Sequence, residues 1–311
     1  MRRNLAIACI ALGVFAIVLA PLLRFWVADA LMRTPMDYYQ EPVHQAQNAT
    51  YFNIEDVELV EDATIEAHTT LRADVAASDT DVVVWDQFTW VRHADSPGDN
   101  DFAIESNTRR VGHDRFTGEA VDCCDASVNE ESVVQTGQAY KFPFLTEQRD
   151  YEYFDTTTLQ AEPMVFDGVD EIKGHETYRF VQEIPETKID ERVIPADVLG
   201  IESDDEDQTD ITTDEMYSVE RTFWIDPITG VPLNQHEHQR ITAHVDGQEE
   251  LVLIDADLQW TDETIDAYID SASQGMTAIP IVRTGLPIVL LVAGGILTVG
   301  GVILYLSARR V

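Results

Sequence analysis

Two adjacent cysteines have the most distinctive chemistry in this chain. Cys123 and Cys124 lie in its polar middle, whereas Cys9 lies in an apolar run near the N-terminus. Because cysteines outside the cytoplasm can form disulfides, the pair indicates a bridge between neighbours, an intermolecular bond or two thiols. Neighbouring residues rarely meet normal disulfide geometry, and two cysteines are too few ligands for a metal site. The residues alone leave the three alternatives open.

A histidine pair is the best candidate for metal binding. His236 and His238 alternate on an expected strand, which places both on one face, and His244 follows. A third ligand is not evident, so a solvated strand face is the preferred interpretation. The acidic run 202–210 (ESDDEDQTD) does not have the ligand spacing of a calcium loop and is interpreted as a surface loop. We therefore expect no metal and no cofactor.

The composition also restricts the function classes. The sequence contains no Gly-x-Ser-x-Gly, phosphate-binding glycine loop or His-Glu-x-x-His, so we expect no enzyme activity. A formal net charge of −37 argues against nucleic acid as a partner. Three lysines against 17 arginines, combined with this acidity, favour a high-salt habitat in which screening weakens self-repulsion.

A repeated turn is the most informative pattern in the polar middle. Residues 109–121 (RRVGHDRFTGEAV) align with 221–233 (RTFWIDPITGVPL). Aspartate can accept backbone hydrogen bonds in such a turn, and glycine supplies a positive φ. The interpretation is two related β units, although hairpins of this type also arise independently. The matched turn residues are Asp114, Thr117 and Gly118 in the first copy and Asp226, Thr229 and Gly230 in the second.

The segments around these turns are predicted to be mainly β. We expect antiparallel sheets from two related units, 51–150 and 151–260, as a sandwich or a half-barrel. Tyr51-Phe52-Asn53 near the start of the first unit echoes Tyr153-Phe154-Asp155 in the second. Alternation and β-branched or aromatic residues indicate strands at 54–66, 82–91, 102–114, 119–122, 133–140, 149–154, 164–172, 176–184, 216–225, 231–244 and 248–260, with a turn cluster at 96–100.

Two apolar runs bracket the β region. Residues 5–23 and 285–306 are each long enough to cross a membrane as a helix. The first run competes with a signal peptide, but it is long, and Arg24 to Trp26 fill the region expected to be small and neutral. An uncleaved anchor over 1–32 is therefore the preferred interpretation, with a second span over 284–311.

Cationic residues next to the two spans predict the topology. Arg2 and Arg3 precede the first span, and Arg309 and Arg310 follow the second. By the positive-inside rule, we expect a two-pass cell-membrane protein with both termini cytoplasmic and residues 33–282 extracytoplasmic. Residues 33–50 are predicted to be a linker. Thr261 is expected to cap a short helix within 261–283 that ends near Gly275.

Two smaller features could add partners. Gly294, Gly295, Gly300 and Gly301 lie in the second span, and such small residues favour close helix packing against the first span or against another copy in a homo-oligomer. Asn48 begins an Asn-Ala-Thr glycosylation sequon on the expected outer side.

With these motifs in hand, the chain resembles the actinobacterial and archaeal porin-A-like family. The resemblance covers nearly the whole length, and its motifs have no assigned catalytic or binding roles to carry over. The matching motifs include the cysteine pair, the paired spans, Arg72-Ala73-Asp74-Val75, Trp85-Asp86, Tyr140-Lys141-Phe142-Pro143-Phe144, Thr146-Glu147 and Tyr153-Phe154-Asp155.

The sequence thus predicts a membrane-anchored cell-envelope protein with a large acidic outer β domain in a structural or binding role. One alternative is lipid or hydrophobic-ligand handling, since a curved sheet with a helix across it can hold an acyl chain. The other alternative is a pore, which the family resemblance implies. The acidic strand faces do not match the outward apolar band of a membrane β-barrel. The expected partners are the lipid bilayer, a lipid ligand or other envelope proteins.

Overall fold

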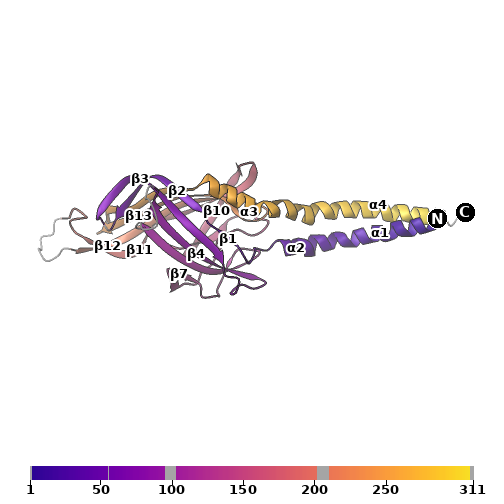
Figure 1. Cartoon of the computed structure of the whole chain (residues 1–311), viewed down its shortest axis with the longest axis horizontal. Coiled ribbons are helices and arrows are strands. Elements are labelled where there is room, and N and C mark those ends of the chain that lie inside the picture. The colour runs from indigo at the N-terminus through magenta and orange to yellow at the C-terminus, as the bar shows by residue number, and fades with distance from the viewer. Residues whose placement is uncertain (1, 55, 95–102, 202–209, 309–311) are drawn as a thin grey trace. The chain divides into compact units, whose positions relative to one another are not determined.

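The computed structural model describes residues 2–54, 56–94, 103–201 and 210–308. The turn cluster 96–100, the acidic run 202–209 and the C-terminal arginine pair lie outside the described residues. The chain divides into two compact units, which we call the sheet unit (Thr34–Asp270) and the helical unit (Met1–Arg33 with Ser271–Val311). Figure 1 labels many of their helices and strands.

The sheet unit contains one continuous antiparallel sheet, which has fourteen strands within the described residues. The strand order is β8-β7-β5-β4-β3-β2-β14-β13-β12-β11-β10-β9, with β1 paired to β3 and β6 to β5. Their bounds are β1 (Tyr39–Gln40), β2 (Val43–Asn53), β3 (Glu58–Ala73), β4 (Val82–His93), β5 (Glu105–Asp114), β6 (Ala120–Val121), β7 (Ser127–Val128), β8 (Glu131–Ser132), β9 (Tyr151–Asp155), β10 (Gln160–Ile172), β11 (His175–Pro195), β12 (Asp210–Ile225), β13 (Pro232–Val245) and β14 (Gln248–Trp260).

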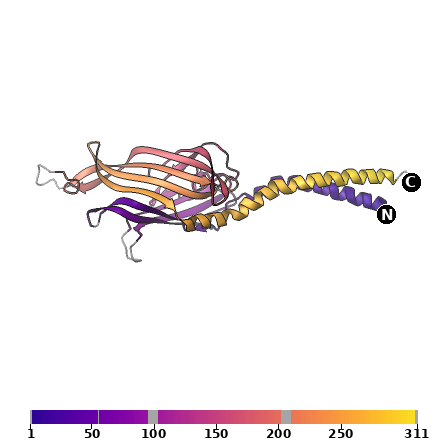
Figure 2. The same cartoon turned by 90° about the horizontal axis from the view of Figure 1, so that it is seen from above.

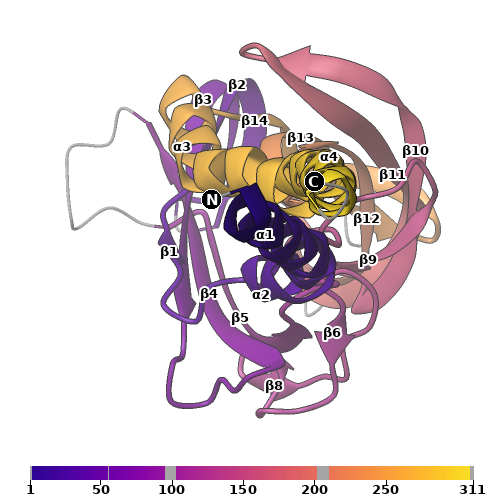
Figure 3. The ribbon, with the colours of Figure 1, turned by 90° about the vertical axis from the view of Figure 1, so that its right-hand side faces the viewer.

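The predicted mainly β, antiparallel fold is confirmed, and its two halves share a single sheet. Figure 3 shows the strands following a curve from β5 (purple) to β10 and β11 (pink). In Figure 2 the indigo β2–β3 hairpin lies beside the orange strands β13 and β14, in agreement with the pairing of β2 with β14. The sheet does not close into a barrel, although isolated backbone bridges join Gln138 to Glu119 and to Tyr153 in β9.

One face of the sheet forms the core, and we call it the inner face. Alternate residues of β12 are buried from Thr213 to Phe223, as expected for a strand with one covered face. Ile65 and Ile254 belong to one apolar cluster, and Phe180 belongs to another. Each such side chain contributes about 1.5–3 kcal/mol when it leaves water.

Three local expectations differ from the structure. Residues 43–50, predicted as a linker, begin β2, which pairs with β3 and β14. Residues 133–140, predicted as a strand, lie outside the named strands, because their backbone contacts are single bridges and turns. The helix after Thr261 continues past Gly275, since α3 extends from Asp262 to Pro280. Thr261 Oγ1 does accept from the N–H of Thr264 at 3.3 Å, as a capping residue does.

The helical unit contains the two apolar helices that the sequence predicts. Its segments are α1 (Arg2–Leu22), η1 (Leu23–Val27), α2 (Ala28–Leu31), the end of α3, η2 (Ile281–Gly285) and α4 (Leu286–Ser307), where η marks π-helical turns. Within the described residues, the stretches Arg2–Leu31 and Asp262–Ser307 are long and apolar enough to cross a membrane.

Glycines allow α1 and α4 to approach closely. A Cβ atom at Gly294 would lie 2.7 Å from the carbonyl oxygen of Gly13, and one at Gly301 would lie 2.7 Å from Ile10. Gly295 and Gly300 have no neighbour within 4 Å at that position. Gly294 and Gly301 therefore serve packing between the two spans, as small residues do in membrane helices.

Candidate functional site

The first repeated turn, at the end of β5, is held by one aspartate. Asp114 Oδ1 accepts from the N–H groups of Phe116 and Thr117 at 2.8 and 2.7 Å. The N–H of Gly118 donates to the carbonyl of Asp114 at 2.9 Å, and the φ of Gly118 is +74°. Glycine suits this position because other residues are strained at a positive φ.

The second repeated turn, at the end of β12, has the same backbone path. Asp226 Oδ2 accepts from the N–H and the hydroxyl of Thr229 at 2.6 and 2.5 Å. The N–H of Gly230 donates to the Asp226 carbonyl at 2.9 Å, and the φ of Gly230 is +72°. Asp226 is buried, and burial raises its pKa against the opposing effect of the Thr229 donors.

Two further turns share this plan but were missed in the sequence. Asp155 Oδ1 accepts from the N–H of Thr158 at 2.7 Å, and Leu159 takes the position with φ +58°. Asn53 Oδ1 accepts from the N–H of Asp56 at 3.3 Å, and Val57 has φ +53°. Neither turn contains a glycine, so the Asp-x-x-Thr-Gly pattern does not identify them. Their signal was the Tyr-Phe-Asn/Asp echo, which places Asn53 and Asp155 at the same point after a strand.

A bridging segment, residues 137–145, bonds to both repeated turns. The N–H of Ala139 donates to the Gly118 carbonyl at 3.0 Å, and the N–H of Phe142 donates to the Gly230 carbonyl at 2.8 Å. A Cβ atom at Gly118 would lie 2.5 Å from the Lys141 carbonyl oxygen. The two turns are therefore joined through backbone contacts that leave no room for a side chain.

Arg221 lies at the centre of a buried ionic network on the inner face. Its Nε donates to Glu237 at 2.5 Å, its Nη2 donates to Asp155 at 3.1 Å, and its Nη1 donates to Gln182 at 2.6 Å. The hydroxyl of Tyr217 also donates to Asp155, at 3.1 Å. Burial disfavours the charged form of Arg221, but the Glu237 and Asp155 carboxylates hold its pKa well above the ordinary value for arginine.

Arg109, which aligns with Arg221 in the repeat, is buried in different surroundings. Its Nε donates to Gln135 at 2.8 Å, and its Nη1 donates to the carbonyl of Ala139 at 2.9 Å. Its guanidinium carbon lies 4.6 Å from the ring centroid of Tyr140, within cation–π distance. Among the described residues, no carboxylate lies within ion-pair distance of it, and its Nη2 has no hydrogen-bond partner.

Two other titratable side chains, those of Lys141 and His113, are also buried in the sheet unit. Lys141 Nζ lies 3.9 Å from the ring centroid of Phe144 and has no hydrogen-bond partner among the described residues. Burial lowers the pKa of Lys141 to about 7, against the attraction of Asp114. His113 is fully buried, and this burial, together with the charges of Lys141 and Arg109, lowers its pKa to about 3. This part of the core therefore favours neutral side chains.

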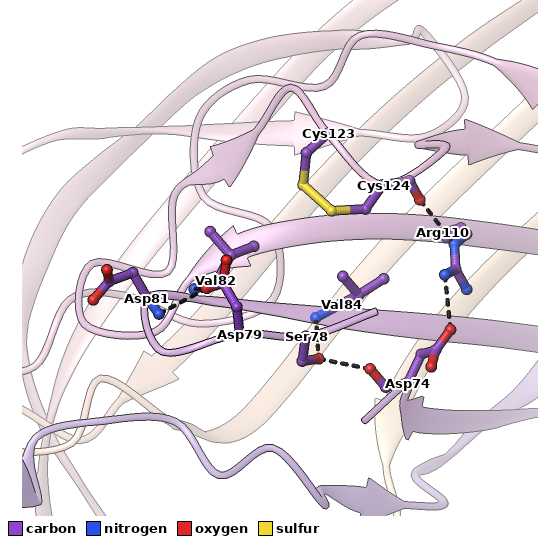
Figure 4. The surroundings of a disulfide bond; sticks show 9 residues. All are labelled: Asp74, Ser78, Asp79, Asp81, Val82, Val84, Arg110, Cys123 and Cys124. Carbon is purple, nitrogen blue, oxygen red and sulfur yellow. Dashed lines mark hydrogen bonds and ion pairs between the residues drawn. A yellow bond between two sulfur atoms is a disulfide. The ribbon is translucent and has the colours of Figure 1, made fainter. Parts of the chain in front are cut away.

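Cys123 and Cys124 form a disulfide between adjacent residues (Figure 4). The carbonyl of Cys124 accepts from Arg110 Nε at 2.9 Å, and the same guanidinium contacts Asp74 at 2.8 Å. A Cβ atom at Gly112 would lie 2.5 Å from the sulfur of Cys123, so the bridge packs directly on the backbone of β5. Cys9 is a free thiol in α1.

The histidine pair has carboxylate partners. His236 Nε2 bonds to Asp257, and His238 Nε2 lies 3.0 Å from Asp255, both across the β13–β14 pair. His244 is buried and contacts Thr242 at 2.9 Å. Within the described residues, no group of three or more histidine, cysteine or acidic side chains could hold a metal ion. Asn48 is exposed in β2, with a φ of +57°, and its glycosylation stays a prediction.

A pocket of about 430 Å³ lies where β12, β13 and β14 meet the start of α3, and we call it the α3 pocket. Two indoles, Trp224 and Trp260, contribute to its wall. The side chains of Asn234 and Gln259 add amides. Five of its eight lining residues are polar, so the pocket combines indole rings with hydrogen-bonding groups. No local sequence pattern predicts this pocket, because its residues come from four elements.

The fold defines a mainly β protein with two terminal membrane-length helices and a pocket beside the start of α3. The chain matches the family described as Porin PorA over residues 5–303, and it belongs to that family. A curated relative from Corynebacterium resistens, named Porin PorA, is 25% identical over 234 residues, which cover 56% of this chain and 57% of the relative. The match therefore spans less than two thirds of the relative's length.

Proposed function

We propose that this protein is a two-pass envelope protein whose sheet unit lies outside the cytoplasm and binds a small ligand in the α3 pocket. The role is non-enzymatic. The pocket carries the binding proposal, because it combines a volume of about 430 Å³ with aromatic and polar lining residues. The two membrane-length helices at the chain ends and the arginine pairs beside them support the topology.

Labelling with a membrane-impermeant maleimide tests the topology. Single cysteines are introduced at exposed Glu250 in the sheet unit and at Arg3, in a background in which the native cysteines are replaced by serine. We expect intact cells to label the Glu250→Cys variant and to label the Arg3→Cys variant only after permeabilisation. Labelling of both variants in intact cells, or of neither, would overturn the proposed topology.

Native mass spectrometry of the full chain in nanodiscs tests the binding role. We expect a bound small molecule that is lost on Trp224→Ala, because this residue contributes to the pocket wall. The same spectra separate this proposal from lipid handling, in which the bound species would be an acyl lipid retained by the Trp224→Ala variant. In the lipid-handling alternative, the acyl chain would have to share the interior of the sheet unit with large, fully buried side chains, among them those of Tyr217, Phe154 and Phe180.

Pore formation is the second candidate, and membership of the Porin PorA family favours it. The sheet is not closed, so a pore would require the spans of several copies. Conductance of the full chain in planar bilayers tests the idea. Gly295→Leu places bulk on a face of α4 with no neighbour, whereas Gly294→Leu disrupts packing against α1. Conductance that the wild type shows and that Gly295→Leu abolishes would support a pore assembled from several helix pairs.

A further inference from the structure

We propose that the ligand of the α3 pocket is a neutral saccharide, an inference that rests on the binding role proposed above. The first argument concerns the two indoles in the lining. Trp224 Nε1 donates to Asp170 at 2.9 Å, and Trp260 Nε1 donates to His44 at 2.7 Å. Because both N–H groups are already bonded, neither indole keeps a donor for a ligand. Trp260 is buried with its ring centroid 4.3 Å from that of Tyr268, so the accessible apolar surface comes mainly from the half-buried Trp224. Such surfaces pack against the C–H groups of a sugar ring.

The amide side chains supply the second argument. Asn234 Oδ1 accepts from the N–H of Gln235 at 2.9 Å, which holds the amide and leaves its amino group to donate to a ligand. Gln259 Nε2 donates to Asp257 at 3.3 Å, which leaves its carbonyl oxygen as an acceptor. A saccharide hydroxyl both donates and accepts, so it matches a lining that presents one group of each kind.

Charge restricts the ligand class further. The pocket lining contains no lysine or arginine, and its histidine, His236, is bonded to Asp257, so a phosphate or carboxylate would compete with that aspartate for the imidazole. Asp262 is the acidic lining residue, and its carboxylate contacts Lys173 Nζ at 3.2 Å, outside the lining. Because Lys173 also contacts Asp266 at 2.7 Å, it offsets only part of the Asp262 charge and weakens the attraction of this carboxylate for a cationic ligand. A neutral polar ligand therefore fits best.

The pocket volume agrees with this class. At about 430 Å³, it lies near the lower end of the range of roughly 300–1,000 Å³ for small-molecule sites. This space suits a monosaccharide or a disaccharide. Ile265 adds an aliphatic side chain from the first turns of α3.

Isothermal titration calorimetry of the full chain with glucose, maltose, cellobiose and trehalose tests the proposal. The protein is kept in a polyoxyethylene detergent, because alkyl glycoside detergents carry a competing sugar. We expect saturable binding of at least one sugar and weakening of more than about tenfold on Trp224→Ala. Asn234→Asp, which keeps the side-chain size but adds a charge, is expected to weaken binding similarly.

Trp90→Ala is the matched control, because Trp90 is partly exposed on β4 and stacks on His68 outside the pocket. Glucose 6-phosphate forms the charged arm and is expected to bind more weakly than glucose. The absence of binding for all four sugars, or binding that both pocket variants retain, would overturn the saccharide assignment. If native mass spectrometry then shows another small molecule that Trp224→Ala releases, the proposed binding function stands and only the ligand class fails.

Discussion

The two copies of the repeat have the same backbone but opposite electrostatic surroundings. Arg221 faces Glu237 across the β12–β13 pair, whereas Arg109 faces Val128 across the β5–β7 pair. Arg221 is therefore neutralised by carboxylates, whereas Arg109 is stabilised by carbonyl oxygens and by the ring of Tyr140. The same turn geometry is therefore compatible with very different charges behind it.

Replacing each arginine by methionine tests this difference with the largest expected effect. Arg221→Met leaves Asp155 and Glu237 buried without their cation, so we expect a loss of about 3–5 kcal/mol in the free energy of unfolding. Arg109→Met strands no carboxylate and is expected to cost about 1–2 kcal/mol. Urea unfolding of the full chain in detergent, followed by tryptophan fluorescence, measures both. Equal losses would contradict the comparison.

Substitutions of the turn glycines sharpen the structural half of the comparison. In Gly230→Ala, the new Cβ would overlap the Phe142 carbonyl oxygen at a positive φ, so we expect a loss of about 3 kcal/mol. Gly118→Ala meets the Lys141 carbonyl oxygen at 2.5 Å and is expected to cost slightly less. Gly247→Ala is the control, because its φ of +77° is similar but no atom lies within 4 Å, and about 1 kcal/mol is expected. If Gly230→Ala lowers the free energy of unfolding no more than the control does, the bridging segment can move to accommodate the new methyl group.

Lys141, the buried lysine near the first repeated turn, should make the stability of the protein depend on pH. Its pKa is lowered to about 7 in the folded protein, so above that pH the unfolded chain binds a proton that the folded chain does not. Stability should therefore rise between pH 7 and the unfolded value near 10.5, by about 2–3 kcal/mol from pH 7 to 9. We expect Lys141→Met to remove this component.

Lys188→Met is the control for that measurement, because Lys188 is exposed and its pKa is raised by Asp214 and Glu191. The control should retain the rise in stability between pH 7 and 9. If Lys141→Met also retains it, Lys141 is charged in the folded protein, and the first turn is more polar than we infer.

The smallest expected effect distinguishes the two turn aspartates. Burial raises the pKa of Asp226, so ionisation of the folded protein costs stability as the pH rises from the unfolded value toward the raised one. Asp226→Asn keeps an acceptor for Thr229 and removes this cost, so we expect a change below about 1 kcal/mol at pH 7 and a flatter profile between pH 4 and 7. Thermal unfolding of Asp114→Asn in parallel provides the comparison. A large loss in Asp226→Asn would show that its charge is needed.

Some of these features could be predicted from the sequence because they depend on neighbouring residues. Gly118 and Gly230 identify their turns, since the aspartate, threonine and glycine all act within five positions. The two apolar spans follow from their length alone. The turns at Leu159 and Val57 did not follow, because a positive φ there is imposed on residues that rarely adopt it.

The mainly β character, the repeated turns and the membrane-length helices can be predicted from the chain alone, because each is encoded by local spacing and composition. Three features required the folded structure: the pairing of Arg221 with carboxylates, the bridge between the two cysteines, and the pocket in which Trp224, Asn234, Gln259 and Asp262 meet. Strand register sets these contacts, and register depends on the packing of the whole inner face rather than on any one segment.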